Sequence, residues 1–148
     1  MKMRVKPSRG YLTIELSGEF DLNLFIDLMP RILDACASRG TSKLLLDARP
    51  LRGGASMTDR YFFAETFARL YKERRVAGTV KRVQFAMLAK SPLLDPQRFG
   101  EKVATARGLQ LKAFAKLWEA RAWLEVNLPK GENDATEPPI IPRSRPKR

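Results

Sequence analysis

The stretch LLLDARPLRGGASMTDRYFF, residues 44–63, contains the unit on which the prediction of the fold rests. It begins with an apolar run that ends in Asp47, as a strand covered by helices on its sheet would. A loop with the adjacent glycines Gly53 and Gly54 follows, and Ser56 then precedes a helical pattern. Strand, loop and helix in this order form the repeating unit of parallel α/β sheets.

The four residues Ser56, Met57, Thr58 and Asp59 resemble a capping box in which Asp replaces the usual Glu. Ser56 is expected to accept a backbone N–H at the start of the helix, and Asp59 to face the positive end of the helix dipole. A phosphate at this position would also suit a helix amino terminus. The pattern favours a structural cap and leaves a regulatory phosphorylation site at Ser56 as the alternative.

The rest of the chain alternates between the two-residue period of strands and the 3.6-residue period of helices. Elements are predicted for strands 3–5 and 11–18, a helix from Asp21 to Gly40, strand 43–48, a helix over 57–75, strand 82–89, a helix that begins at Asp95-Pro96 and stops before Gly108, strand 109–114 and a helix over 116–126. Pro30 lies inside the first helix and should kink it. The order β-β-α-β-α-β-α-β-α predicts an α/β fold with a mostly parallel sheet, one antiparallel strand and helices packed on the sheet.

The length and composition suit one folded domain, residues 1–128, followed by a tail, residues 129–148. The tail is rich in proline and basic residues but poor in apolar ones, so it is predicted to be disordered and removable without loss of the fold. The chain has 28 Lys and Arg against 16 Asp and Glu, a net charge of +12. This balance favours anionic partners without selecting one.

Several classes of function are excluded by residues that the sequence lacks. It has no histidine and one cysteine, Cys36, which continues an apolar helical stripe and is expected to be a buried thiol. A histidine general base, a Ser-His-Asp triad and a zinc or iron–sulfur site are therefore not expected. Neither a GxxxxGK[ST] nor a GxGxxG motif occurs. We expect no enzyme activity, no cofactor and no metal.

No secretory signal and no apolar segment long enough for a membrane span are found, so a cytoplasmic protein is expected.

Basic residues cluster where the second helix ends and before the following strand. The candidate anion contacts are Lys72, Arg74, Arg75, Lys81 and Arg82. Aromatic residues do not alternate with these charges, so weak, salt-sensitive contacts with nucleic acid or acidic lipid are the most that they predict. Lys2, Arg4 and Lys6 are expected to protect an exposed sheet edge.

Four pieces of the sequence resemble STAS domains, specifically the SpoIIAA-like branch that is grouped with Sec14-like folds. They are LTIELSGEF (12–20), KLLLDAR (43–49), RFGEKVATARGLQLKAF (98–114) and EARAWL (119–124). The resemblance covers about residues 10 to 126 and implies a small bacterial β/α domain that binds other proteins and is not an enzyme.

In the anti-sigma-factor antagonists of this superfamily, the first serine of an Asp-Ser-Ser-Gly motif accepts phosphate from a partner kinase. The matching position is Ser56, nine residues after Asp47, but Ala55, Met57 and Thr58 stand where the motif has Asp, Ser and Gly. The candidate regulatory or contact residues are Asp47, Arg49, Arg52, Gly53, Gly54, Ser56, Thr58 and Asp59. The leading hypothesis is a non-catalytic STAS-like module that binds a protein. An anion-binding module is the alternative, and a lipid pocket implied by the Sec14-like kinship is a third option.

Overall fold

The computed structural model describes residues 1–125. In this part of the chain the elements are β1 (Lys2–Ser8), β2 (Tyr11–Glu19), α1 (Leu22–Ser38), β3 (Lys43–Asp47), β4 (Leu51–Arg52), α2 (Met57–Ala77), β5 (Gln84–Leu88), α3 (Phe99–Ala106), β6 (Leu111–Phe114) and α4 (Leu117–Leu124). The predicted tail, residues 129–148, and the last residues of the predicted domain lie outside the described residues.

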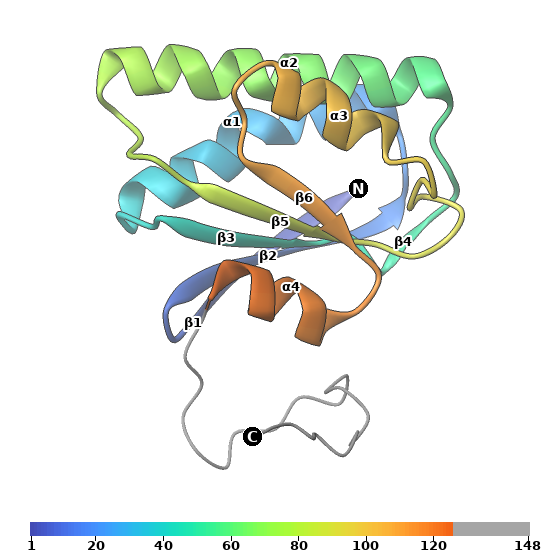
Figure 1. The fold of residues 1–148 in the computed structure, drawn as a ribbon, viewed down its shortest axis with the longest axis horizontal. Helices are drawn as coiled ribbons and strands as arrows, with labels where there is room; N and C mark the ends of the chain where they lie inside the picture. Colours follow the sequence, from blue (N-terminus) through green and yellow to red (C-terminus); the bar gives the residue numbers. More distant parts are fainter. Residues whose placement is uncertain (126–148) are drawn as a thin grey trace, which may run out of the picture.

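The strands form one mixed sheet in the order β1-β2-β3-β5-β6, with β4 paired to β2 (Figure 1). β1 pairs antiparallel with β2, and every other pair is parallel. Each parallel connection passes through a helix, because parallel neighbours need a long crossover. The predicted fold class, a mostly parallel sheet with one antiparallel strand, is confirmed.

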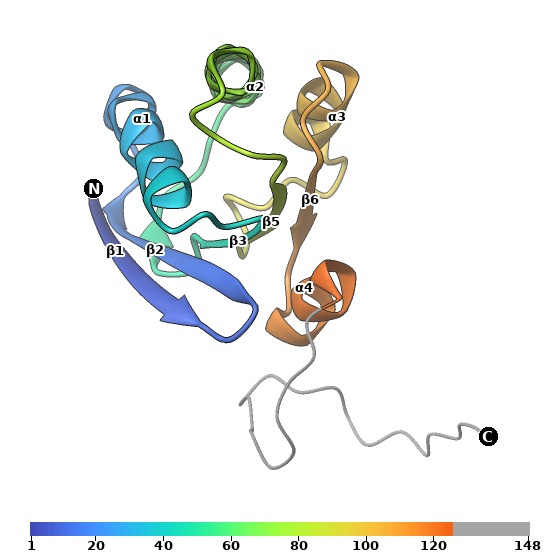
Figure 2. The same cartoon turned by 90° about the vertical axis from the view of Figure 1, so that its left-hand side faces the viewer.

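The two faces of the sheet are covered unequally (Figure 2). Helices α1, α2 and α3 pack on one face, and α4 packs alone on the other within the described residues. The larger core lies under α1 to α3 and includes Ile14, Leu46 and Phe85. The smaller core lies under α4 and includes Leu45, Phe114 and Leu124. Adjacent residues of one strand therefore point into different cores, as the two-residue period of a strand requires.

Helix α1 shows how the sequence pattern produces an element. The side chain of Asp21 accepts the backbone N–H of Leu24 and caps the helix. Its apolar stripe is buried and includes Met29, Ile32 and Cys36. The predicted burial of Cys36 is confirmed, and burial raises the pKa of its thiol to about 12. The thiol is therefore inert at neutral pH.

The predicted start of the third helix was wrong. The sequence places it at Asp95-Pro96, whereas α3 begins at Phe99. The Asp95 carboxylate accepts the N–H groups of Gln97 and Phe99, and Arg98 has φ 57°, which is a left-handed conformation. A residue in that conformation cannot continue a right-handed helix, so residues 95–98 form a turn that leads into α3.

Two further features of the sheet are the short strand β4 and the edge strand β1. The short strand β4 lies within the loop that was predicted between strand 43–48 and Ser56. β1 is an edge strand on which Lys2, Arg4 and Lys6 are exposed, as predicted, and Arg4 and Lys6 both pair with Glu15 of β2. No helix within residues 1–125 combines the length and the apolar character needed to cross a membrane.

Candidate contact site

The candidate contact residues lie at the end of the sheet where the parallel strands terminate. Helices α1, α2 and α3 run opposite to the strands, so their amino ends meet at this carboxyl edge (Figure 1). The loop 49–56 between β3 and α2 crosses the same edge. In parallel α/β sheets this edge is where binding sites usually form, because loops there can vary without disturbing the sheet.

Asp47 organises the start of the loop. Its carboxylate accepts the Nε–H and an Nη2–H of Arg49 at 3.0 and 2.9 Å, and the backbone N–H of Arg49 at 3.1 Å. Asp47 is buried, while Arg49 is half-buried. A buried carboxylate that receives several N–H donors has its charge compensated locally. Asp47 therefore acts as a fixed anchor of the loop backbone.

The middle of the loop is held by its neighbours. Arg52 pairs with Glu19 at 3.3 Å, and both side chains are exposed. Gly53 has φ 90°, which favours glycine. A Cβ added to Gly54 would stand 3.3 Å from Cγ of Pro92, so this glycine permits close approach of the segment after β5. Gly54 therefore lets the loop lie against Pro92, although both glycines remain exposed.

Ser56 and Asp59 form the predicted capping box. The Asp59 N–H donates to Oγ of Ser56 at 3.0 Å, and the Ser56 N–H donates to Oδ2 of Asp59 at 3.1 Å. Ser56 and Thr58 are exposed, so the hydroxyl of Ser56 is accessible as well as structural. This geometry confirms the cap and leaves the phosphorylation site untested.

Arg60 of α2 anchors the site to the segment after β5, a role that the sequence did not reveal. Its Nη2 donates to the carbonyls of Pro92 and Leu93 at 3.1 and 3.0 Å, and its Nη1 lies 3.8 Å from Asp95. The N–H of Phe99 is the main cause that lowers the pKa of Asp95; burial opposes it, and Arg60 adds to it. The first turns of α2 are therefore tied to residues more than 30 positions away.

Apolar side chains gather at the amino end of α2 and remain exposed. Met57 is 56% exposed, Phe62 47% and Tyr61 38%, and Leu24 at the amino end of α1 is 45% exposed. The rings of Tyr61 and Phe62 meet edge to face at 5.5 Å, and Arg107, the residue that follows α3, lies over the ring of Tyr61. We call Met57, Tyr61, Phe62 and the loop 49–56 the contact face.

These exposed apolar residues were not predicted from the sequence, although the sequence contains a signal for Phe62. Phe62 falls outside the stripe formed by Phe63, Phe67 and Tyr71, so it occupies a position where an amphipathic helix normally has a polar residue. A single apolar residue on the outer side of a helix is ordinary, so Phe62 becomes informative only together with the exposed Met57 and Tyr61 beside it.

The candidate anion contacts lie at the opposite end of α2 and are not brought together with the contact face. Arg74 pairs with Asp34, and Nη1 of Arg75 donates to the carbonyl of Val80 at 3.4 Å. Lys72, Lys81 and Arg82 are exposed. Because α2 has 21 residues, its two ends are roughly 30 Å apart.

Residues 1–125 contain no cluster of side chains that could bind a metal ion, and the carboxylates at the contact face are already engaged. Within residues 1–125, no three Cys, Asp or Glu side chains converge closely enough to hold a metal ion. Three carboxylates at the contact face, those of Glu19, Asp47 and Asp59, are engaged with Arg52, with Arg49 and with the amino end of α2, respectively.

Known structures share this fold. The chain is similar to the crystal structure of an anti-sigma factor antagonist from Mycobacterium paratuberculosis, with a TM-score of 0.55 and 13% identity over 84% of this chain and 93% of that one. It also matches the anti-sigma factor antagonist SpoIIAA in its unphosphorylated form, with a TM-score of 0.46 and 14% identity over 86% of this chain and all of that one. No protein-family model and no curated protein matches the sequence.

The first of these similarities defines the class of fold. The chain shares the α/β fold of the anti-sigma factor antagonist from Mycobacterium paratuberculosis, with the mixed sheet that the resemblance implied. At 13% identity the similarity extends to the fold alone. Function has to be argued from the residues of this chain.

Proposed function

We propose that the protein is a non-catalytic STAS-like module of the bacterial cytoplasm that binds another protein through its contact face. It needs no cofactor in this role. The fold supports a binding module, and the protein similar to it in structure is described as an anti-sigma factor antagonist.

The observation that carries the proposal is the position of the exposed apolar side chains. Five large ones are exposed within residues 1–125, and Met57, Tyr61 and Phe62 lie within two turns of Ser56. Single exposed apolar residues are ordinary, but a group of them beside a fixed loop is typical of an interface. Methionine and aromatic residues are enriched in the cores of protein interfaces.

Capture of the partner from the cells that produce the protein, followed by mass spectrometry, tests the proposal. Phe62→Ser should reduce capture strongly, because an exposed aromatic at the centre of an interface often carries much of the binding energy. Val76→Ser is the matched control, since Val76 is 81% exposed on the same helix but lies at its other end. Equal loss of capture in both variants, or in neither, would contradict the proposed surface.

Ser56 is proposed as a cap whose accessible hydroxyl lies within the contact face. A phosphate on Oγ would place about two negative charges next to the Asp59 carboxylate, which lies 3.1 Å from the Ser56 nitrogen. The same phosphate would still accept the N–H groups at the helix start. Phosphate found on Ser56 in protein purified from its own cells would turn this cap into a regulatory site.

The alternative function is anion binding through Lys72, Lys81 and Arg82, which are exposed near the carboxyl end of α2. Two of the five candidate cations, Arg74 and Arg75, are engaged within the protein. A titration with duplex and single-stranded DNA near physiological salt tests this function. Sub-micromolar binding with a sequence preference would favour it over protein contact.

A further inference from the structure

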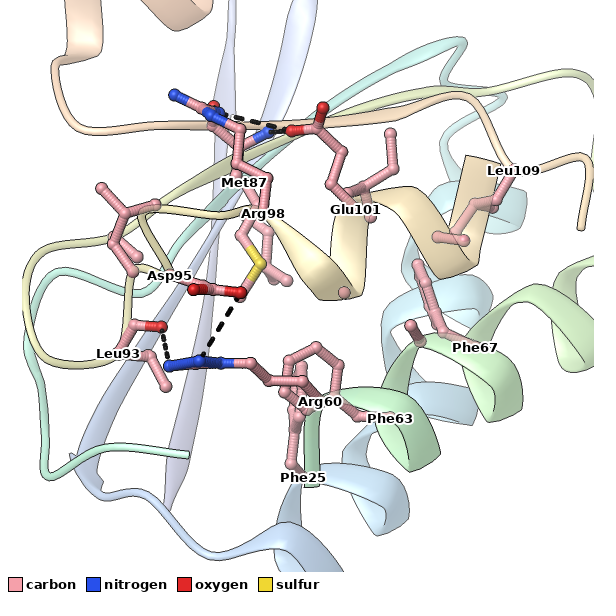
Figure 3. Close-up of a pocket in the computed structure, with 18 of the residues that line it drawn as sticks. Phe25, Arg60, Phe63, Phe67, Met87, Leu93, Asp95, Arg98, Glu101 and Leu109 are labelled. Carbon is pink, nitrogen blue, oxygen red and sulfur yellow. Dashed lines mark hydrogen bonds and ion pairs between the residues drawn. The ribbon is translucent and has the colours of Figure 1, made fainter. Parts of the chain in front are cut away.

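A cavity that is partly open to solvent lies between the sheet and helices α1 to α3 (Figure 3). Its volume is about 60 Å³. One water molecule requires about 10–15 Å³ measured in this way, so the cavity exceeds the small voids that are ordinary in protein interiors. Met87, on the central strand β5 and directed toward the helices, remains half-buried, whereas Phe85 on the same side of that strand is buried.

The wall of the cavity is apolar and comes from several elements. It includes Ile32 of α1, Phe63 and Phe67 of α2, Met87 of β5, and Leu109 and Leu111 at β6. Figure 3 shows Phe63, Phe67, Met87 and Leu109 around the same space. A water molecule needs two to four polar partners, and these side chains offer none.

The charged residues at the cavity are already paired with one another. Arg60 reaches Leu93 and Asp95, and Arg98 donates to Glu101 and to the carbonyl of Ala113. Glu101 also accepts the N–H of Ala113 at 2.8 Å. The two arginines and two carboxylates sum to zero charge. A charged ligand would have to break one of these partly buried pairs, which is costly.

We propose that this cavity is a binding site for one small, neutral, apolar molecule. A cavity of about 150 Å³ holds a benzene ring or xenon, so the volume of about 60 Å³ in this protein selects a group of the size of xenon or a short branched alkyl group. This volume does not enclose a whole lipid chain, which the Sec14-like kinship would imply. The proposal does not depend on the protein-contact role.

The test follows amide signals of the full-length protein by NMR under increasing xenon pressure. Saturable shifts are expected for Phe63 and Leu111, on opposite walls of the cavity, and small ones for Leu45 in the core under α4. Isobutyrate, which is branched and small but charged, should produce no saturable shift at the same residues. Binding of isobutyrate there, or the absence of saturation by xenon, would overturn the proposal.

Two substitutions on α3 distinguish xenon binding in the cavity from nonspecific effects of xenon on the protein. Ala104 is buried and lines the cavity, so Ala104→Val should fill part of it and weaken xenon binding by about tenfold. Ala106→Val makes the same change on the exposed side of the same helix and should leave binding unchanged. Ala64→Val introduces a methyl-rich side chain from α2 and serves as a second filling variant if the first fails to fold. Equal affinity in the filled and unfilled proteins would refute the site.

Discussion

The two ends of helix α2 use similar residues in opposite ways. At the amino end the arginine faces inward and the apolar side chains face outward: Arg60 is 11% exposed, whereas Phe62 is 47% exposed. At the carboxyl end Tyr71 is buried, and Arg74 pairs with Asp34, whose side chain is 67% exposed. The amino end is a fixed surface with exposed apolar side chains, and the carboxyl end is an ordinary solvated terminus.

This difference shows that the contribution of a charged side chain to stability depends on its burial and on its hydrogen-bond partners. Arg60 and Arg74 both carry ion pairs, yet only the side chain of Arg60 also donates to two backbone carbonyls. An ion pair in solvent contributes little to stability, while a largely buried guanidinium with several acceptors contributes more. The comparison can be tested at each end in turn.

The largest effect is expected when the two arginines are replaced by methionine, which keeps much of the apolar stem. Arg60→Met should lower the free energy of unfolding by roughly 2 kcal/mol, because two carbonyls and Asp95 lose a charged donor. Arg74→Met should lower it by less than about 1 kcal/mol. Urea denaturation of both variants measures the difference, and equal losses would show that the two ends are not distinct.

A smaller effect is expected at the cap. Ser56→Ala should cost roughly 1 kcal/mol, because the N–H of Asp59 loses its acceptor. Ser56→Asp should cost little, since a carboxylate also accepts that N–H and suits the helix dipole. Stability and partner capture should be measured on the same samples. A change in capture by Ser56→Asp with unaltered stability would indicate a switch in place of a cap alone.

Protonation of Asp95 should contribute to the loss of stability at acidic pH. Its pKa is lowered from 3.8 in the folded state, chiefly by the N–H of Phe99. The resulting stabilisation is present above the ordinary pKa and is lost as the pH falls through the lower folded value. Asp95→Asn should therefore flatten the decline of the unfolding free energy below about pH 4. A decline as steep as that of the parent protein would assign it to other carboxylates.

The smallest effect on stability is expected at the carboxyl end of α2. Lys72→Gln, Lys81→Gln and Arg82→Gln together should change the free energy of unfolding by less than about 0.5 kcal/mol per site, because these side chains are exposed. Partner capture should stay unchanged, while any weak binding of DNA should fall. Loss of partner capture in the triple variant would move the contact surface to this end of the helix.

Local patterns were sufficient for features that depend on neighbours in the sequence. Alternation in residues 11–18 predicted β2, and the sequence Ser56 to Asp59 predicted a capping box that the structure contains. The same reasoning failed at Asp95-Pro96, where an acceptable helix start became a turn. Arg98 adopts its left-handed conformation while its side chain reaches Glu101 and Ala113, and the bond to Ala113 on β6 is not visible in the local sequence.

The amino-acid sequence alone was enough to predict the order of the elements apart from β4, the burial of Cys36 and the absence of histidine chemistry, because periodicity acts over short distances and composition over the whole chain. Only the tertiary structure decided that Arg60 would bind Leu93, that Gly54 would approach Pro92 and that Phe62 would remain exposed. These outcomes depend on which helices and loops become neighbours. Packing creates those contacts between residues far apart in the chain, and it leaves both the contact face and the cavity as its consequences.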